Sequence, residues 1–277
     1  MTGFATKVRI IVVRPVWRRL IRLLQRRELR KGNERVIVNF EGSNLLLEIN
    51  DTHDYLMLRS FRKSGCYERA TTLLLRRQLQ PGDLFIDGGA NNGYFSVLAC
   101  ELVGSDGVVH SFEPNPYAFK RLESNIALNG ITKGVRTHLM GLSNTEGVAE
   151  LWLSEYEDGL ATMRPSGSSS ISVPVCRLES LDCDWRRTIV KLDIEGKESD
   201  VIESLIMHLP RGSLPRMIVE WNPETSDARL WDAFQGSYRI AQICESPSGY
   251  YLAPICDVAS LLKLPLSNLW ATPSTSG

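Results

Sequence analysis

The segment DLFIDGGANNGYFS, residues 83–96, limits the fold of this chain more than any other stretch. Its first half reads as a buried β-strand that ends at Asp87, and a turn rich in glycine then leads into a helix. Glycine lets a turn adopt positive φ and bring its N–H groups close to a ligand, and the helix offers the positive end of its dipole. This order predicts an α/β fold with a nucleotide-like ligand at the turn.

Two kinds of ligand fit the turn. The spacing Gly88-x-Ala90-x-x-Gly93 matches the dinucleotide fingerprint with alanine for its middle glycine, and Glu113 follows at the end of the next apolar run, where an acid would bind a ribose. Asp87 favours a different ligand, because a carboxylate beside the turn repels a pyrophosphate and attracts a cation. S-adenosylmethionine is such a ligand. Both carboxylates close successive strands, so we expect them at the carboxyl edge of the sheet.

Four motifs in order resemble those of FkbM-type S-adenosylmethionine-dependent methyltransferases. They are DGGANNGYFS, EPNP at 113–116, GLSN at 141–144 and KLDIEGKE at 191–198, within a resemblance that spans residues 67–222 and includes the pair Tyr67-Glu68. The resemblance implies a class I methyltransferase, which has a Rossmann-like, mostly parallel sheet, helices on both faces and an antiparallel edge hairpin. The cofactor residues expected on this basis are Glu68, Asp87, Gly88, Gly89, Ala90, Asn91, Gly93, Glu113, Pro114, Asn115, Leu142, Ser143 and Asp193.

The predicted strand at residues 189–193 carries charges where a central parallel strand is normally apolar. Lys191 and Asp193 are two residues apart and therefore share a face, with Glu195 just beyond the strand and Glu220 at the end of the next one. A lone buried lysine is costly, so Lys191 should pair with Asp193 or another acid. A purely structural ion pair is the alternative to a catalytic role.

Methyl transfer to a hydroxyl requires removal of a proton. We expect Asp193 or Glu195 to be the base, with Glu220 next and Lys191 as their partner. The three acids could also hold Mg²⁺, although the sequence fixes no geometry for a metal. The sequence DIEG is not the Asn/Asp-Pro-Pro-aromatic motif of nucleobase amino-methyltransferases, which favours O-methylation of a hydroxyl, on a sugar or glycoconjugate, and no nucleic-acid partner.

Two other classes of function stay open at this point. The glycine spacing and Glu113 would also suit an NAD-dependent oxidoreductase. A catalytically silent protein with the same fold, which binds a membrane or a partner through a basic arm, is the second alternative. Which cofactor binds separates the first from a methyltransferase, and turnover of a methyl group separates the second.

The chain divides by composition into an arm, a connector and one large domain. It has 277 residues and no net charge, and its six cysteines include no CxxC pair, which favours reduced thiols and a cytoplasmic location. A polar, serine-rich loop at residues 154–170 could act as a lid over the site. The predicted parts are a basic amphipathic arm at 1–34, a β-hairpin and connector at 35–66, the methyltransferase domain at 67–270 and a frayed tail at 271–277.

The arm concentrates positive charge. Residues 1–36 contain eleven Lys or Arg and two acids, a local charge of +9. Apolar residues recur at helical spacing between Val13 and Leu24, with arginines on the opposite side, and no window reaches the ~20 apolar residues of a membrane span. Residues 13–30 are therefore expected to lie on an anionic membrane surface, which would make the protein peripheral at the inner membrane. Packing against the domain and nucleic-acid binding are the alternatives.

Overall fold

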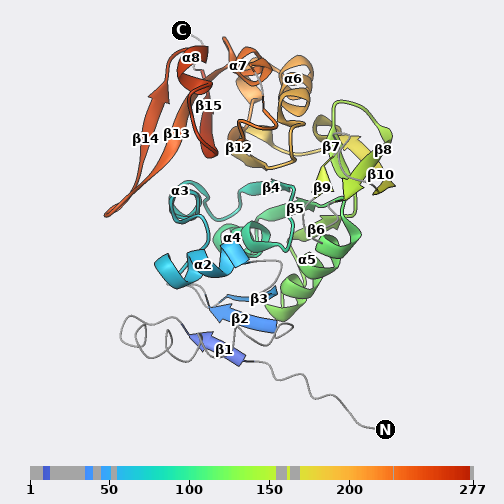
Figure 1. Ribbon diagram of the computed structural model, residues 1–277. Helices are drawn as coiled ribbons and strands as arrows, with labels where there is room; N and C mark the ends of the chain where they lie inside the picture. Colours follow the sequence, from blue (N-terminus) through green and yellow to red (C-terminus); the bar gives the residue numbers. More distant parts are fainter. Residues whose placement is uncertain are drawn as a thin grey trace.

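The computed structural model describes residues 9–12, 35–39, 45–50, 55–153, 161–162, 169–226 and 228–274. These residues form three β-sheets, and helices cover the largest sheet on both faces (Figure 1). Residues 13–30 of the basic arm and most of the loop at 154–170 lie outside the described residues, so the membrane and lid predictions stay predictions. No helix in the described part of the chain is long and apolar enough to span a membrane.

The main sheet has eight strands in the order β14-β13-β15-β12-β11-β4-β5-β6. The five strands from β12 to β6 are parallel to one another, whereas β15, β13 and β14 form an antiparallel edge. This arrangement confirms the predicted fold class. The strands are β4 Leu84–Gly88, β5 Val108–Phe112, β6 Val135–His138, β11 Thr188–Leu192, β12 Arg216–Trp221, β13 Tyr238–Ser246, β14 Gly249–Ile255 and β15 Ser267–Pro273.

Two hydrophobic cores lie on the two faces of this sheet. Successive side chains of a strand point to opposite faces, so in β4 Phe85 belongs to one core and Ile86 to the other, and neither is exposed to solvent. The first core also contains residues of α2 Tyr55–Ser64, α3 Arg69–Gln78, α4 Tyr94–Val103 and α5 Pro116–Leu128. The second contains residues of α6 Glu198–His208, α7 Arg229–Phe234 and α8 Val258–Leu261. Short 3-10 helices are η2 Leu178–Ser180, η3 Trp185–Arg187 and η4 Arg211–Ser213.

Two smaller sheets flank the main one. The first has the order β1-β2-β3, and its antiparallel pair β2 and β3 is the predicted hairpin; the parallel strand β1 beside β2 was not predicted. The second has the order β7-β10-β8-β9 and follows the GLSN motif. The strands are β1 Arg9–Val12, β2 Arg35–Asn39, β3 Leu46–Asn50, β7 Gly141–Ser143, β8 Gly147–Leu153, β9 Ala161–Thr162 and β10 Ser169–Arg177.

The prediction that residues 271–277 form a frayed tail is wrong for residues 271–273, which belong to strand β15. Strand β15 inserts between β12 and β13 and pairs with both. Its residues Leu269, Trp270 and Ala271 are buried, because an inserted strand contacts the cores on both faces of the sheet. Residues 275–277 lie outside the described part of the chain.

Candidate active site

The predicted acidic residues meet at the carboxyl edge of the parallel strands. Asp87 lies near the end of β4, Glu113 directly follows β5, Asp193 directly follows β11, and Glu220 lies near the end of β12. Because these strands are parallel neighbours, their ends converge on one rim.

Asp87 is almost completely buried behind the glycine turn. Its Oδ2 accepts a hydrogen bond of 2.6 Å from the Ser96 hydroxyl, which in turn accepts one of 2.8 Å from Ser111. Its Oδ1 is buried and has no hydrogen-bond partner among the described residues. Burial raises the pKa of Asp87, while the charge of Lys191 opposes that rise. A buried, unpartnered carboxylate oxygen fits the cationic ammonium group of S-adenosylmethionine.

The turn itself depends on glycine. Gly89 has φ +76° and Gly93 has φ +85°, which L side chains rarely adopt, and a Cβ at Gly89 would overlap the carbonyl oxygen of Asp193. The N–H groups of Gly89 and Ala90 donate to the carbonyl of Phe112 in β5. The turn is therefore in contact with the end of β11, which makes the predicted cofactor turn and the predicted catalytic strand one structural unit.

Glu113 is held by backbone donors on both of its oxygens. Asn91 N–H donates to Oε2 at 2.7 Å, and Asn115 N–H donates to Oε1 at 2.8 Å. Burial raises the pKa of Glu113 to about 7, although these two bonds favour the ionised form. Each oxygen keeps a second lone pair, so the expected acceptance of ribose hydroxyls stays a prediction. Pro114 and Asn115 continue from Glu113 into α5, where the Asn115 side chain caps the helix.

The GLSN motif also contacts the start of the turn. A Cβ at Gly88 would lie 2.7 Å from Cδ1 of Leu142, so the Leu142 side chain packs directly on the turn. Ser143 is next along β7 and is also buried. The structure thus brings Leu142 to the predicted cofactor residues, and a polar contact from Ser143 to a ligand stays a prediction.

Lys191 confirms the pairing expected from its buried position. Its ammonium donates to Asp193 Oδ2 at 2.9 Å and lies 5.0 Å from the centre of the Phe95 ring. Burial by itself lowers the pKa of Lys191, but the negative charges around it outweigh burial and raise that pKa overall. These charges belong to Asp193, Asp87 and Glu68, so one cation links the cofactor side of the rim to the catalytic side.

Three predicted catalytic carboxylates form a cluster. Oxygen atoms of Asp193, Glu195 and Glu220 lie within 4.8 Å of one another, and all three side chains are half-buried. Burial, with the charge of Asp193, raises the pKa of Glu195 to about 7 and that of Glu220 to about 9. Carboxylates in this state exchange protons near neutral pH, which suits acid–base work.

Two further residues shape the rim, and sequence reasoning gave neither of them a role. Buried Glu198 accepts from the N–H groups of Ile194 at 2.9 Å and Gly196 at 3.0 Å, which fixes the loop where Glu195 has φ +53°. Asn268 in β15 donates at 2.7 Å to Glu68, the residue that precedes α3. An acid in the first helical turn was a usable signal for Glu198, whereas nothing local connects Asn268 to a residue so far away in the chain.

Glu68 lies within the electrostatic reach of the cluster. Burial and Asp193 raise its pKa, whereas Lys191 and the bond from Asn268 act in the opposite direction. Burial and the charge of Glu68 also raise the pKa of Tyr67, so this phenol stays protonated. The structure therefore brings Glu68 to the site, as expected, with Tyr67 beside it.

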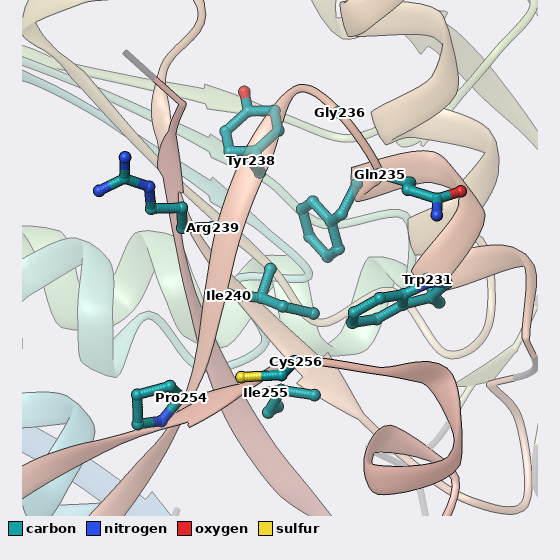
Figure 2. A pocket seen from close by; sticks show the side chains of 10 residues that line it. Trp231, Gln235, Gly236, Tyr238, Arg239, Ile240, Pro254, Ile255 and Cys256 are labelled. Carbon is teal, nitrogen blue, oxygen red and sulfur yellow. The ribbon is translucent and has the colours of Figure 1, made fainter. Parts of the chain in front are cut away.

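A cavity of about 340 Å³ lies elsewhere, between α7 and the edge strands β13 and β14 (Figure 2). It shares no residue with the rim and is lined mainly by apolar side chains. In Figure 2 the Tyr238 hydroxyl and the Arg239 guanidinium both point away from the group formed by Trp231, Ile240 and Cys256. Because its lining is mainly apolar, this cavity offers few of the convergent donors and acceptors that an active site needs.

The profile of the family described as the Methyltransferase FkbM domain matches residues 87–239, which is more than half of the chain. Methyltransferase sdnD from Sordaria araneosa is 29% identical over 140 residues, which make up 50% of this chain and 51% of that protein. The chain thus spans about half the length of this curated relative.

Two solved methyltransferase structures have low sequence identity to this chain. A methyltransferase FkbM from Methylobacillus flagellatus is 13% identical, with a TM-score of 0.43 and coverage of 79% of this chain and 53% of that one. An S-adenosylmethionine-dependent O-methyltransferase from Thermotoga maritima is 13% identical, with a TM-score of 0.45 and coverage of 89% and 95%. The match over residues 87–239 shows that the chain belongs to the FkbM methyltransferase family.

Proposed function

We propose that this methyltransferase acts on a hydroxyl group of a sugar or glycoconjugate and that Glu195 removes the hydroxyl proton. The observation that carries the proposal is the cluster of Asp193, Glu195 and Glu220, whose oxygens lie within 4.8 Å of one another beside the glycine turn. A hydroxyl gives up its proton slowly near neutral pH, so O-methylation profits from a carboxylate in this place. The family match supports methyl transfer, and the acceptor is our inference.

The residues along the rim would have separate roles in binding and alignment. When bound, S-adenosylmethionine supplies a methyl group on a sulfonium, and in-line transfer then depends on alignment. Asp87 would bind the cofactor's ammonium through its unpartnered Oδ1, and Glu113 would fix the ribose. Lys191 holds Asp193 in place through one of its oxygens.

Glu195 is the best of the three carboxylates for the role of base. Asp193 already accepts from Lys191, which makes its lone pairs less available. The pKa of Glu220 is raised to about 9 by burial, so it is mostly protonated at neutral pH and can donate a hydrogen bond to the acceptor. The pKa of Glu195 near 7 leaves a large ionised fraction at that pH. Asp193, Glu195 and Glu220 would then act as a charge, a base and a hydrogen-bond donor, respectively.

A divalent cation is a second way to use the same cluster. Carboxylate oxygens are the ligands that Mg²⁺ prefers, but Lys191 already supplies a positive charge to Asp193. Turnover that survives a chelator would favour the base over the metal, and turnover restored only by added Mg²⁺ would favour the metal.

The test uses the full chain with labelled S-adenosylmethionine and glycolipid or polysaccharide extracts from cells that lack the protein. Mass spectrometry should then show a sugar that has gained one methyl group as an ether, which survives mild alkali. Methyl on nitrogen would overturn the O-methylation proposal. Cofactor binding without turnover of any acceptor would favour the catalytically silent alternative.

The basic arm supports a separate proposal about location. The charge of +9 over residues 1–36 and the apolar spacing of the arm are typical of helices that lie on anionic lipid, where each basic residue adds about 1 kcal/mol of attraction. The full chain should sediment with vesicles that contain anionic lipid, and less so as salt is raised. A chain that starts near residue 35 should stay in the supernatant and still bind cofactor. Failure of the full chain to sediment at low salt would refute a membrane role.

A further inference from the structure

Asn125 and Asn129 lie one helical turn apart in and just after α5, beside strand β3 (Figure 1). Asn129 Oδ1 accepts from Leu46 N–H at 2.7 Å, and its Nδ2 donates to the Leu46 carbonyl at 2.6 Å. Asn125 Oδ1 accepts from Glu48 N–H at 2.7 Å, and its Nδ2 lies 3.4 Å from the Glu48 carbonyl. The two side-chain amides thus bind the backbone of β3 as a neighbouring strand would.

This pair of amides closes one edge of β3, while β2 pairs with the other edge. Between the two bonded positions, Leu47 points into the first core, and Ile49 follows; neither is exposed to solvent. The small N-terminal sheet is therefore attached to α5 by polar contacts and to the core by apolar ones. An uncovered strand edge would invite pairing with another chain, so the amides also protect the fold.

Asn125 makes one contact that Asn129 does not. Its Nδ2 also donates at 2.7 Å to the carbonyl of Asn92, and Asn125 is fully buried. Asn92 belongs to the glycine turn and directly follows Asn91, whose N–H donates to Glu113. The Asn92 side chain also donates to the sulfur of Met57 in α2 at 3.2 Å. Elements that precede the matched family region thus contact the back of the cofactor turn.

We propose that Asn125 is a positioning residue for the cofactor turn and that, through it, cofactor binding and the docking of β3 stabilise each other. This inference rests on cofactor binding at the glycine turn. A ligand that orders the turn stabilises the hydrogen bond from the Asn125 side chain to the Asn92 carbonyl. The same side-chain amide accepts the hydrogen bond from Glu48 N–H in β3. Coupling between two sites is reciprocal, so a docked β3 must also favour the bound turn.

The first experiment needs no variant. Hydrogen exchange is measured on the full chain with and without S-adenosylhomocysteine, the demethylated product, which cannot react. Exchange at the Leu46 and Glu48 amides should slow when the product binds, because local opening of β3 then costs more. Product that binds without slowing exchange at residues 45–50 would overturn the inference. Product that does not bind at all would instead contradict the cofactor assignment.

The second experiment compares two matched variants, Asn125→Leu and Asn129→Leu. Each removes a side-chain amide that binds β3, but only the first also removes the donor to the Asn92 carbonyl. Calorimetry should show product binding about tenfold weaker in Asn125→Leu, as expected for one lost buried hydrogen bond, and changed by less than about twofold in Asn129→Leu. Product should slow exchange at residue 48 in Asn129→Leu and not in Asn125→Leu. Equal losses of affinity in both variants would mean that the amides only hold the fold together.

Discussion

Strands β11 and β15 both bring a polar side chain to the rim, and they do so in opposite ways. The parallel strand β11 ends at the rim, so the polar residues Asp193 and Glu195 follow its apolar run. The antiparallel strand β15 begins there, and its Asn268 precedes the apolar residues. The direction of a strand therefore decides whether a functional side chain stands after or before the buried segment.

The two strands also differ in how directly their residues take part in the proposed active site. The residues of β11 and the loop after it include a buried ion pair and Glu195, a carboxylate of the cluster whose pKa is raised to about 7 by burial and by the charge of Asp193. Asn268 contacts the site through Glu68 and Thr71 and lies opposite Glu220 in the register of β12 and β15. We therefore expect large effects from substitutions at the end of β11, intermediate ones at β4 and small ones at β15.

The largest effect is expected at the proposed base. Glu195→Gln should lower kcat by about 10²–10⁴-fold and leave the affinity for S-adenosylhomocysteine nearly unchanged, because the amide keeps the shape but cannot take a proton. In the parent protein, kcat/KM should rise with pH up to about 7, where Glu195 becomes ionised, and this rise should be absent in the variant. Unchanged turnover would move the base to Asp193 or Glu220.

The same residue gives a stability test with a defined sign. The pKa of Glu195 is raised from 4.5 to about 7 in the folded chain, so the unfolded chain loses this proton first as the pH rises. Stability should therefore fall between about pH 4.5 and pH 7, and Glu195→Gln should remove part of that fall. Thermal unfolding at the two ends of this range would measure it, and an equal slope in both proteins would contradict the assignment.

Lys191→Met should be next in size and should act on stability. It leaves the charges of Asp193, Asp87 and Glu68 without their shared cation, and breaking a buried ion pair costs about 3–5 kcal/mol. The matched control is Lys197→Met, since the Lys197–Asp200 pair has a similar length of 3.0 Å but a lysine side chain that is 34% exposed, against 3% for Lys191. Urea denaturation should show a loss of at most about 1 kcal/mol in this control. Similar losses in both variants would mean that the Lys191 pair behaves as a surface pair.

Asp87→Ala tests the end of β4. It removes the carboxylate whose Oδ1 has no partner within the described chain, so S-adenosylmethionine binding should weaken by roughly 1–3 kcal/mol. Glu113→Ala should weaken S-adenosylmethionine binding as well.

Calorimetry with NAD should show no binding to the parent protein. Tighter binding of NAD than of S-adenosylmethionine would contradict the cofactor assignment.

Sequence reasoning succeeded where a local pattern carried the information. The helix predicted after the glycine turn is α4 in the structure, where Gly93 and Gly104 flank one apolar segment. The pairing of Lys191 with Asp193 followed from the two-residue period of a strand and from the cost of a lone buried charge.

Sequence reasoning failed where contacts between distant segments determine the structure. Strand β15 was not predicted and its last three residues were assigned to a frayed tail, whereas its place between β12 and β13 is set by its pairing with both of these distant strands. The amide of Asn125 looks like an ordinary helix residue until β3 is placed against it. Contacts between segments that are distant in sequence produce no periodic pattern of residues in either segment.

Asn268→Leu should have the smallest effect, and it tests the comparison most sharply. Leucine fills a similar volume, so β15 should stay in place, while Glu68 loses one of its hydrogen-bond donors and its pKa rises further above the usual range. Glu68 would then carry less negative charge beside Lys191, and we expect turnover to fall by no more than about tenfold, in line with one hydrogen bond. The matched control is Gln242→Leu, because Gln242 donates at 3.0 Å to Ser267, the neighbour of Asn268 in β15, and does not contact Glu68. If both variants lower turnover equally, β15 only stabilises the fold. A loss of turnover confined to Asn268→Leu means that this antiparallel strand is part of the active site.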